Sequence, residues 1–176
     1  SYKEMERISN LKTASEVLVL VRIPLNNDKI NFSGVNIMLD DIKDPGNLGT
    51  IIRICDWFGV ENIFCSRETV DAYNHKVVQS SMGSISRLKI KYVDLKEFIN
   101  IIPSDVKIYL TDVGGKDVNE IELYKNSIII FGNESRGISS KLNNLIDNKI
   151  AIRRIGNTDS LNVAISAGII LHKFCS

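Results

Sequence analysis

The sequence predicts an α/β fold in which a mostly parallel sheet is flanked by helices, and three observations support this prediction. From residue 35 onward, apolar runs of strand length alternate with stretches of helical periodicity, as in parallel sheets covered on both faces. A length of 176 residues suits one main core better than two full domains. Glycines and polar residues gather directly after several expected strands, where sheets of this kind bind ligands.

The first part of the chain divides from the rest at Gly34. We expect a short helix over residues 5–12 and a buried strand over the apolar run at residues 16–21. Residues 25–33 are rich in Asn, Asp and Lys, which is typical of a linker. Because a lone helix and strand cannot bury a core of their own, residues 1–33 are expected to be the tail of an upstream domain or an appendage packed on the main one.

The remainder of the chain carries the alternating pattern. The expected strands are short, nearly continuous apolar runs, at residues 35–39, 62–65, 88–93, 106–111, 127–131 and 149–152. The expected helices lie between or after these runs and place apolar residues on one face, at residues 48–58, 75–81, 95–101, 139–146 and 160–174. Each strand is therefore followed by a helical stretch or a glycine-containing polar loop, as the α/β prediction requires.

Charge and cysteine content exclude several classes of protein. The chain has 22 basic and 21 acidic residues, so net charge gives no reason to expect nucleic-acid binding, and any such contact must come from local patches. Cys55, Cys65 and Cys175 are odd in number and lack C-x-x-C spacing, which argues against a zinc ribbon or a disulfide-stapled secreted module. The first two lie among apolar residues and are expected to be buried thiols. Without a membrane-length apolar stretch or a signal peptide, we expect a soluble cytoplasmic protein without membrane partners.

Common catalytic motifs are missing from the sequence. There is no G-x-G-x-x-G for a dinucleotide, no P-loop for phosphoryl transfer and no G-x-S-x-G nucleophile elbow. His75 and His172 lie far apart and share no ligand spacing with a cysteine, so no metal site is predicted. Dehydrogenase, kinase and hydrolase functions are all disfavoured together.

Three polar segments follow expected strands, and each has an ordinary structural explanation when taken alone. Residues 47–53 open a helix, with Asn47 as a plausible N-cap and Arg53 as a surface cation. Residues 132–137 form a strand-to-helix turn whose glycines suit positive φ angles. Ser160 is a plausible cap for the last helix.

Taken together and in this order, the segments resemble the SpoU (TrmH-like) family of RNA ribose 2′-O-methyltransferases, part of the SPOUT superfamily. The resemblance covers residues 35–174. It rests on N-x-G-x-x-x-R at residues 47–53, G-N-E-x-x-G-I at residues 132–138 and S-L-N-V at residues 160–163, with further similarity at residues 76–84.

The resemblance implies a fold and a cofactor that composition alone does not indicate. Members of this family thread the C-terminal chain through a loop to form a deep trefoil knot, an exception to the usual avoidance of knots. They bind S-adenosyl-L-methionine and are typically homodimers that act on tRNA or rRNA. By this similarity, the cofactor contacts in the present chain are Thr111, Gly114, Gly132, Asn133, Ile152 and Leu161.

The resemblance also assigns catalytic roles, to Asn47, Arg53, Glu134, Ser160 and Asn162. Arg53 would lie next to the ribose 2′-hydroxyl. It acts there either as a general base or, because a guanidinium stays protonated, by gripping the adjacent phosphate and stabilising alkoxide charge. Asn47 would orient the substrate or Arg53, and Glu134 would hold Arg53 or a loop of the dimer partner in place, with a purely structural cap as the alternative for Glu134. Ser160 and Asn162 would position the cofactor and the ribose.

Local basic residues are the candidates for RNA contact. Arg136, Arg153 and Arg154 lie near the expected pocket loops, and residues 87–91 place three cations along an expected strand, where a solvated face is an equal alternative. Arg153 stands where the family usually has proline, and this departure leaves open a catalytically silent RNA-binding or assembly module with the same knot. The resemblance makes residues 34–176 the catalytic domain and residues 1–33 the tail of an upstream RNA-binding domain, so that the natural protein would be longer.

Overall fold

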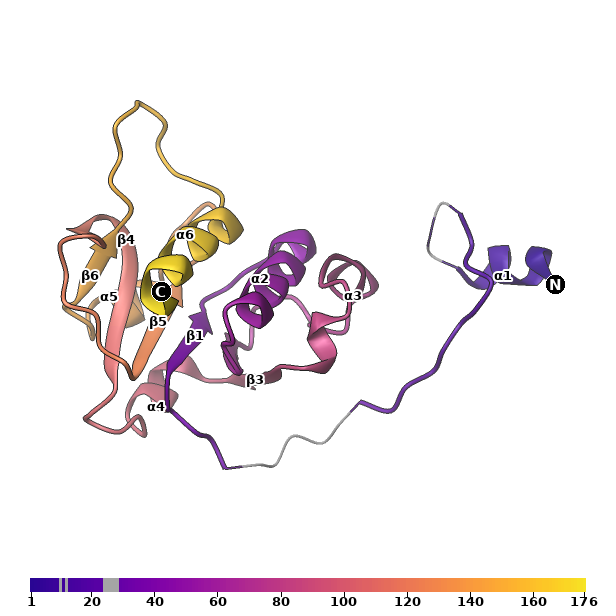
Figure 1. Cartoon of the computed structure of the whole chain (residues 1–176), viewed down its shortest axis with the longest axis horizontal. Helices are drawn as coiled ribbons and strands as arrows, with labels where there is room; N and C mark the ends of the chain where they lie inside the picture. The colour runs from indigo at the N-terminus through magenta and orange to yellow at the C-terminus, as the bar shows by residue number, and fades with distance from the viewer. Residues whose placement is uncertain (10, 12, 24–28) are drawn as a thin grey trace.

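In the computed structural model, which describes residues 1–9, 11, 13–23 and 29–176, six strands form one all-parallel sheet flanked by helices (Figure 1). The order across the sheet is β3-β2-β1-β5-β4-β6, and each neighbouring pair is parallel. The strands are β1 (Val35–Leu39), β2 (Asn62–Ser66), β3 (Lys89–Val93), β4 (Lys107–Asp117), β5 (Ser127–Phe131) and β6 (Lys149–Ala151). This confirms the predicted α/β class and parallel sheet.

The helices pack on both faces of the sheet or extend from it (Figure 1). They are α1 (Tyr2–Ile8), α2 (Pro45–Trp57), α3 (His75–Ser80), the 3-10 turn η1 (Ser84–Ser86), α4 (Leu95–Ile99), α5 (Ser140–Asn143) and α6 (Val163–Cys175). One face is covered by α2 and α6, which pack against each other, and the opposite face is covered by α4 and α5. No helix in the described parts of the chain is long and apolar enough to cross a membrane.

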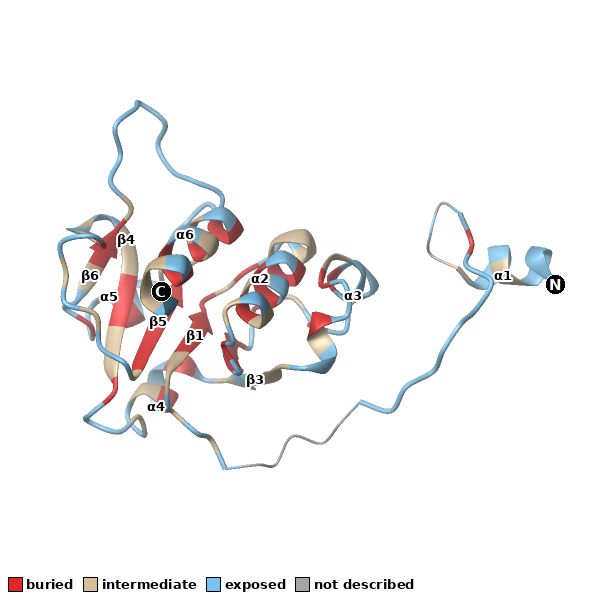
Figure 2. Ribbon diagram, in the orientation of Figure 1, coloured by how far each residue is buried: buried red, intermediate tan, exposed pale blue. Residues whose placement is uncertain are grey.

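The two central strands explain why the sheet needs cover on both sides. In β5, Ile129 and Phe131 pack toward α2 and α6, whereas Ile128 and Ile130 pack toward α4 and α5. Both strands are buried along almost their whole length (Figure 2). A strand buried on both faces is apolar at every position, which is why these runs could be located in the sequence.

Two of the three cysteines belong to this core. Cys55 and Cys65 are buried free thiols, as predicted, whereas Cys175 is exposed. Burial raises the pKa of the Cys65 thiol to about 12 and raises the pKa of Cys55 further. Both thiols therefore stay protonated at neutral pH and act as small apolar side chains.

Both long helices begin at residues other than the predicted caps. The N-cap of α2 is Asp44, whose Oδ1 accepts a hydrogen bond from the Asn47 amide at 2.8 Å, and proline occupies the first helical position. The predicted N-cap, Asn47, is therefore wrong, because that residue lies inside the first turn. Likewise α6 begins after Asn162, which caps the Ala164 amide at 2.9 Å, and the predicted cap Ser160 lies in the preceding loop.

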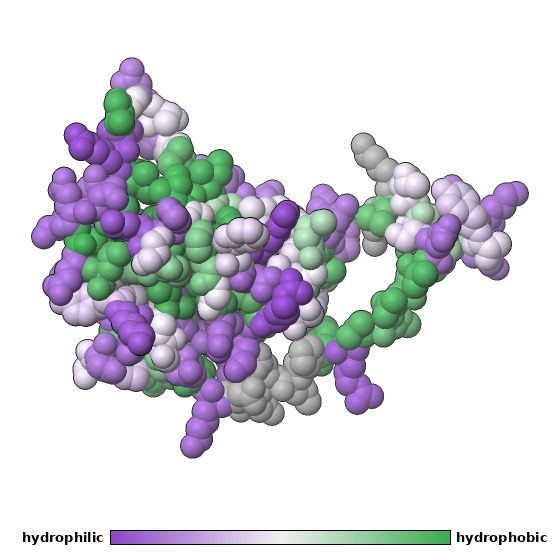
Figure 3. Space-filling model, in the orientation of Figure 1, coloured by the Kyte–Doolittle hydropathy of each residue, from purple (hydrophilic) through white to green (hydrophobic). Residues whose placement is uncertain are grey.

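The N-terminal segment differs from its prediction. A helix is present as α1, but it begins and ends earlier than the predicted residues 5–12, of which residues 10 and 12 lie outside the described residues. Residues 17–21 form no strand, and their side chains are 49% to 91% exposed. This apolar stretch leads from α1 toward the body of the molecule (Figure 3). An apolar run becomes a strand only beside a pairing neighbour, and none of the described residues pairs with it. Part of the predicted linker, residues 25–28, lies outside the described residues.

Further boundaries shift for local reasons. Within the predicted linker, Phe32 packs its ring against Phe64 and Phe98, so this end of the segment belongs to the core. β4 runs past its predicted end at residue 111, because the chain resumes pairing with β6 after an irregularity between Thr111 and Lys116. Arg87, predicted on a strand with two lysines, instead ends η1 and pairs with Asp56.

Candidate functional site

A cavity of about 640 Å³ lies beside the irregular middle of β4 and the ends of β5 and β6. Its walls are this part of β4, the loops that follow β5 and β6, and the start of α6, at residues 111–113, 131–137, 150–156, 158–161, 163, 166 and 170. This is the edge at which parallel α/β sheets bind ligands. The location agrees with the polar and glycine-rich segments that the sequence places after these strands.

The turn after β5 forms one wall of the cavity and closes tightly on itself. The amide of Asn133 donates to the Gly137 carbonyl at 3.0 Å, and the Gly137 amide donates back at 2.9 Å. A Cβ on Gly132 would lie 2.4 Å from the Gly137 carbonyl carbon, and Gly137 has a φ of 67°. Both ends of the turn therefore require glycine, one for space and one for backbone conformation.

The side chain of Asn133 holds this turn in shape. Its Oδ1 accepts the amides of Ser135 and Arg136, each at 3.0 Å, and its Nδ2 donates to the Asp41 carbonyl at 2.8 Å. Asn133 lines the cavity, as expected for a cofactor contact, but these polar atoms already serve the turn. A ligand would meet this residue mainly through its backbone.

Three predicted catalytic residues from three separate segments form a hydrogen-bonded chain. Glu134, on the cavity wall, accepts a bond from Asn47 Nδ2 at 2.9 Å. The Oδ1 of Asn47 in turn accepts a bond from Asn162 Nδ2 at 2.9 Å. The segments that begin α2, follow β5 and begin α6 are thus connected side chain to side chain.

The orientation of both amides in this chain follows from the groups at its ends. An ionised Glu134 can only accept, so Asn47 must direct its NH₂ group to it and its oxygen toward Asn162. At the other end, the Ala164 amide can only donate, so Asn162 must direct its oxygen there and its NH₂ group to Asn47. Both requirements agree, which leaves no alternative arrangement of donors and acceptors.

Glu134 is also directed at the start of α2. The amides of Lys43 and Asp44 point at its carboxylate with long contacts of 3.5 and 3.4 Å. A carboxylate near a helix N-terminus is favoured by the helix dipole. Glu134 therefore serves as a link between the cavity wall and the first turn of α2.

The other two predicted catalytic residues are not part of this chain. Ser160 lines the cavity and is exposed. Arg53 lies two turns along α2, is exposed, and has no hydrogen bond or ion pair with any described residue. The six-residue separation from Asn47 directs the two side chains to different sides of α2.

Most of the predicted cofactor contacts do line the cavity. These are Thr111, Gly132, Asn133, Ile152 and Leu161. The Thr111 hydroxyl donates to the Ile130 carbonyl at 2.9 Å and so ties β4 to β5. Gly114 lies instead in the irregular part of β4, where its amide donates to Asp112 at 2.7 Å and the residue borders a second cavity of about 410 Å³.

The three predicted RNA-binding arginines all lie on the cavity wall and are exposed. Arg153 and Arg154 belong to the long exposed loop between β6 and α6, within which Arg154 donates to the Thr158 carbonyl at 3.3 Å (Figure 2). Arg136 forms an ion pair with Asp41. Its charge is therefore already paired with a carboxylate of the same protein.

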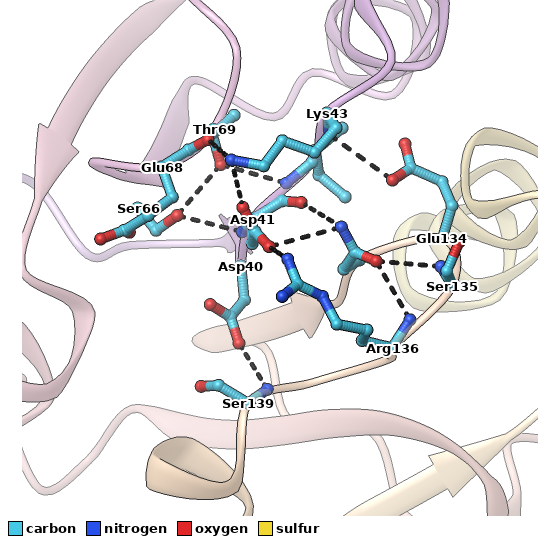
Figure 4. A network of polar contacts seen from close by, with 12 residues as sticks. Asp40, Asp41, Lys43, Ser66, Glu68, Thr69, Glu134, Ser135, Arg136 and Ser139 are labelled. Carbon is cyan, nitrogen blue, oxygen red and sulfur yellow. Dashed lines mark hydrogen bonds and ion pairs between the residues drawn. The ribbon is translucent and has the colours of Figure 1, made fainter.

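The structure adds a polar network that the sequence did not assign to the site (Figure 4). Asp40 and Asp41, directly after β1, contact the loop after β5: Asp40 Oδ2 accepts the Ser139 amide at 2.7 Å, and Asp41 pairs with Arg136. The one available signal was their position after the first strand, beside which the chain order of the sheet reverses. Among the described residues, no three His, Cys, Asp or Glu side chains are grouped so that they could hold a metal ion.

Comparison with known proteins finds relatives across most of the chain. Residues 34–172 match the model of the SpoU rRNA Methylase family. The chain is 28% identical over 167 residues to the Bacillus subtilis 23S rRNA (guanosine(2553)-2′-O)-methyltransferase RlmP, covering 94% of this chain and 66% of that protein. It is 31% identical over 162 residues to the Streptomyces viridochromogenes 23S rRNA (uridine(2479)-2′-O)-methyltransferase, covering 88% and 55%. The chain thus spans between half and two thirds of the length of these relatives.

Solved structures agree with the sequence matches. An AdoMet-bound rRNA methyltransferase from Sinorhizobium meliloti superimposes with a TM-score of 0.75 at 33% identity, covering 80% of this chain and 55% of that one. The SpoU methyltransferase AviRb from Streptomyces viridochromogenes, in complex with AdoMet, gives 0.75 at 26% identity, covering 86% and 60%.

Proposed function

The chain belongs to the SpoU rRNA Methylase family, and we propose that it transfers a methyl group from S-adenosyl-L-methionine to a ribose 2′-hydroxyl in structured RNA, either rRNA or tRNA. Two relatives are named as 23S rRNA 2′-O-methyltransferases, and two similar structures contain AdoMet. The observation that carries the proposal is the hydrogen-bonded chain Glu134–Asn47–Asn162, which begins on the wall of the large cavity.

The cavity offers the kinds of contact that this cofactor needs. S-adenosyl-L-methionine combines an aromatic base, a sulfonium cation and an amino-acid end. The side chains of Ile152, Leu161 and Ile170 provide apolar walls for the base. Carboxylates of Asp112 and Asp159 and the guanidinium of Arg153 provide charges of both signs for the other end. A volume of about 640 Å³ is within the usual range for a ligand of this size.

In the reaction, the cofactor supplies an electrophilic methyl group that needs no metal. The ribose oxygen would accept this methyl group from the sulfonium, and its proton would pass to water or to a phosphate oxygen. Catalysis then depends on alignment and on stabilising charge at the ribose oxygen. Asn47, held by Glu134 and Asn162, orients the substrate, and Arg53 grips the adjacent phosphate because its guanidinium stays protonated.

We also propose that the protein is a homodimer in which Arg53 reaches the cavity of the other copy. Arg53 does not line the cavity of its own chain. One turn further along α2, Trp57 is 84% exposed, and the adjacent α6 exposes Ile165 and Ile169. A second copy would cover this apolar surface and would bring Arg53 to a site that needs a cation.

The dimer proposal can be tested with the single tryptophan of the chain. If a second copy covers Trp57, its fluorescence is protected from acrylamide at high protein concentration and becomes quenchable on dilution. Analytical ultracentrifugation over the same concentrations should show dissociation in parallel. Full quenching at every concentration, with a monomeric mass, would rule out this dimer.

The C-terminal knot and the domain division are proposed on more general grounds. After β6, at one edge of the sheet, the chain returns through residues 152–162 and packs α6 against α2 near the sheet centre, a path consistent with the family knot. Residues 34–176 are proposed as the catalytic domain. The exposed apolar run at residues 17–21 supports the proposal that residues 1–33 are the tail of an upstream RNA-binding domain.

The central proposal is tested by incubating the chain with methyl-labelled S-adenosyl-L-methionine and unmodified rRNA or tRNA transcripts. We expect label in RNA, recovered as a 2′-O-methylnucleoside by mass spectrometry, and we expect Arg53→Ala to abolish it without loss of cofactor binding. A methylated base would contradict the proposed site of transfer. Cofactor binding without methylation of any RNA would favour the catalytically silent RNA-binding module.

A further inference from the structure

Two loops meet beside the point where the chain order of the sheet reverses, between β1 and β5. We call residues 40–44, after β1, the strand-1 loop and residues 132–139, after β5, the strand-5 loop. The strand-5 loop forms a wall of the cavity, whereas the strand-1 loop lies behind it and leads into α2. Contacts that hold the strand-5 loop against the strand-1 loop therefore also hold the cavity wall in place.

Asp41 makes more hydrogen bonds to the strand-5 loop than any other residue of the strand-1 loop, and its backbone is strained. Its φ of 62° lies in the left-handed region, which few residues other than glycine adopt without support. Support comes from its backbone: the amide donates to Ser66 Oγ at 3.0 Å, and the carbonyl accepts from Asn133 Nδ2 at 2.8 Å. The first bond fastens Asp41 to the end of β2 and the second to the strand-5 loop.

The carboxylate of Asp41 bridges two cations from the two loops (Figure 4). Oδ1 lies 2.7 Å from Lys43 Nζ, which itself donates to the Glu68 carbonyl at 2.6 Å, and Oδ2 pairs with the guanidinium of Arg136. The Asp41 side chain is 19% exposed, whereas that of Arg136 is 72% exposed. The partly buried carboxylate is thus the fixed point, and Arg136 folds back onto it from the cavity wall.

The charge around Arg136 argues against a contact with RNA phosphate. The strand-1 and strand-5 loops together contain four carboxylates, Asp40, Asp41, Asp44 and Glu134, against two cations, Lys43 and Arg136. This formal charge of −2 repels a phosphate, and Arg136 would have to leave Asp41 in order to bind one.

We propose that Asp41 is a positioning residue which, through Arg136, holds the strand-5 loop in the form that binds S-adenosyl-L-methionine. Arg136 is then part of the loop support and not a contact to RNA. The inference rests on the proposed function, since it assigns the cofactor to this cavity. The inference gives Asp41 a role that it exerts through Arg136. It also means that cations other than Arg136 contact the RNA.

The two roles of Arg136 predict opposite results for Asp41→Asn. This substitution removes the charge but keeps a residue that tolerates the left-handed region. If Arg136 supports the loop, Asp41→Asn and Arg136→Gln should each weaken cofactor binding by about fivefold, and the double variant should be no weaker than either. If Arg136 contacts phosphate, Asp41→Asn frees it and strengthens RNA binding, whereas Arg136→Gln lowers the salt slope of RNA binding by about one.

The experiment uses the full chain and measures S-adenosyl-L-methionine binding by calorimetry for Asp41→Asn, Arg136→Gln and the double variant. Arg136→Lys keeps the charge and should restore most of the affinity. The matched control is Asp56→Asn, which breaks another aspartate–arginine ion pair, Asp56–Arg87, outside the cavity, and should leave cofactor affinity unchanged. Additive losses in the double variant, or unchanged affinity in both single variants, would overturn the proposal.

Amide hydrogen exchange without cofactor separates this proposal from the proposed function. The Gly137 amide, bonded to the Asn133 carbonyl, reports whether the turn is closed. It should exchange faster in Asp41→Asn and Arg136→Gln by the same factor, and not in Asp56→Asn. If the unmodified chain bound no S-adenosyl-L-methionine, the proposed function would fail, while this exchange would still decide the positioning role: faster exchange supports it, and unchanged exchange contradicts it.

Discussion

The half of the sheet made of β3, β2 and β1 closes its strand ends against one another, whereas the half made of β5, β4 and β6 leaves them open around the cavity. In the first half, the amide of Ile42 donates to Thr69 Oγ1 at 3.3 Å, and the Val70 amide donates to the Ile42 carbonyl at 2.9 Å. In the second half, residues 153–162 are all exposed, and β4 is irregular where it borders the cavity.

The difference separates positioning from binding. The closed half holds α2, and with it Asn47, in a fixed place through hydrogen bonds that do not involve the cavity. The open half contributes Glu134, which meets Asn47 across the boundary between the two halves. The Asp41–Arg136 pair also crosses this boundary, so Asp41 is tied to ligand binding. Elsewhere, a change in the closed half should appear in the free energy of unfolding, and a change in the open half should appear in ligand binding.

The largest effect on binding is expected from Gly132→Ala in the open half. The added Cβ would lie 2.4 Å from the Gly137 carbonyl carbon and from the Ile138 amide nitrogen, so the turn on the cavity wall must open. Overpacking of this kind costs about 1–3 kcal/mol, which predicts about a 5- to 150-fold loss of S-adenosyl-L-methionine affinity. Calorimetry measures it directly.

Gly168→Ala is the matched control for this substitution. A Cβ at Gly168, within α6, would lie at an ordinary 3.7 Å from Ile54 Cδ1. This variant should bind the cofactor as the unmodified chain does. Unchanged affinity in Gly132→Ala would mean that the cofactor does not depend on this turn, and the division between an open and a closed half would lose its basis.

The second effect is expected from Gly49→Ala in the closed half. A Cβ on Gly49 would lie 1.9 Å from Ser80 Oγ and 2.7 Å from the Val77 carbonyl oxygen, so α2 and α3 would have to separate. We expect a loss of about 1–3 kcal/mol in the free energy of unfolding, measured by urea denaturation. Gly168→Ala, also within a helix, should gain about 0.5–1 kcal/mol. A loss of equal size in both variants would refute the steric explanation.

The sequence could predict the fold where a strand is buried on both faces, because such a strand is apolar at every position. β1 and β5 were located to the residue because both of their faces are buried. The far part of β4 could not be found, because the segment at residues 112–117 is polar and glycine-rich and pairs only because β6 lies beside it. The run at residues 17–21 shows the converse: it is apolar but has no neighbour among the described residues, so it stays exposed.

The candidate site was predicted in part. Asn47, Glu134 and Asn162 were expected through the family resemblance, and their direct connection needed the structure, since Asn47 and Asn162 lie 115 residues apart. In the sequence, Asp41 is only one of several polar residues that follow the first strand. Its left-handed backbone and its pairing with Arg136, 95 residues away, depend on how two loops meet, which no local pattern records.

The smallest expected effect is on stability, from the ion pair between Asp56 and Arg87. This pair lies at the end of α2, in the closed half. Arg87 donates to both carboxylate oxygens of Asp56, with its Nη2 at 2.6 Å from Oδ2, and the Ser84 hydroxyl donates to the same oxygen at 2.7 Å. These bonds hold the pKa of Asp56 below its usual value, and the bonds from Arg87 make the larger contribution. The folded state therefore binds this proton less readily than the unfolded state does.

Such a group stabilises the fold above its unfolded-state pKa of about 3.9, and the stabilisation is lost as the pH falls through the lower folded-state pKa. We expect Asp56→Asn to lower the urea midpoint slightly at pH 7, because the pair is exposed to solvent, and to have a shrinking effect as the pH drops below about 4. Cofactor affinity at pH 7 should not change. The contrary result would be urea midpoints of Asp56→Asn and the unmodified chain that still differ in acid, where Asp56 is protonated. That result would show that hydrogen bonds from Ser84 and Arg87, and not the charge of Asp56, hold η1 against α2.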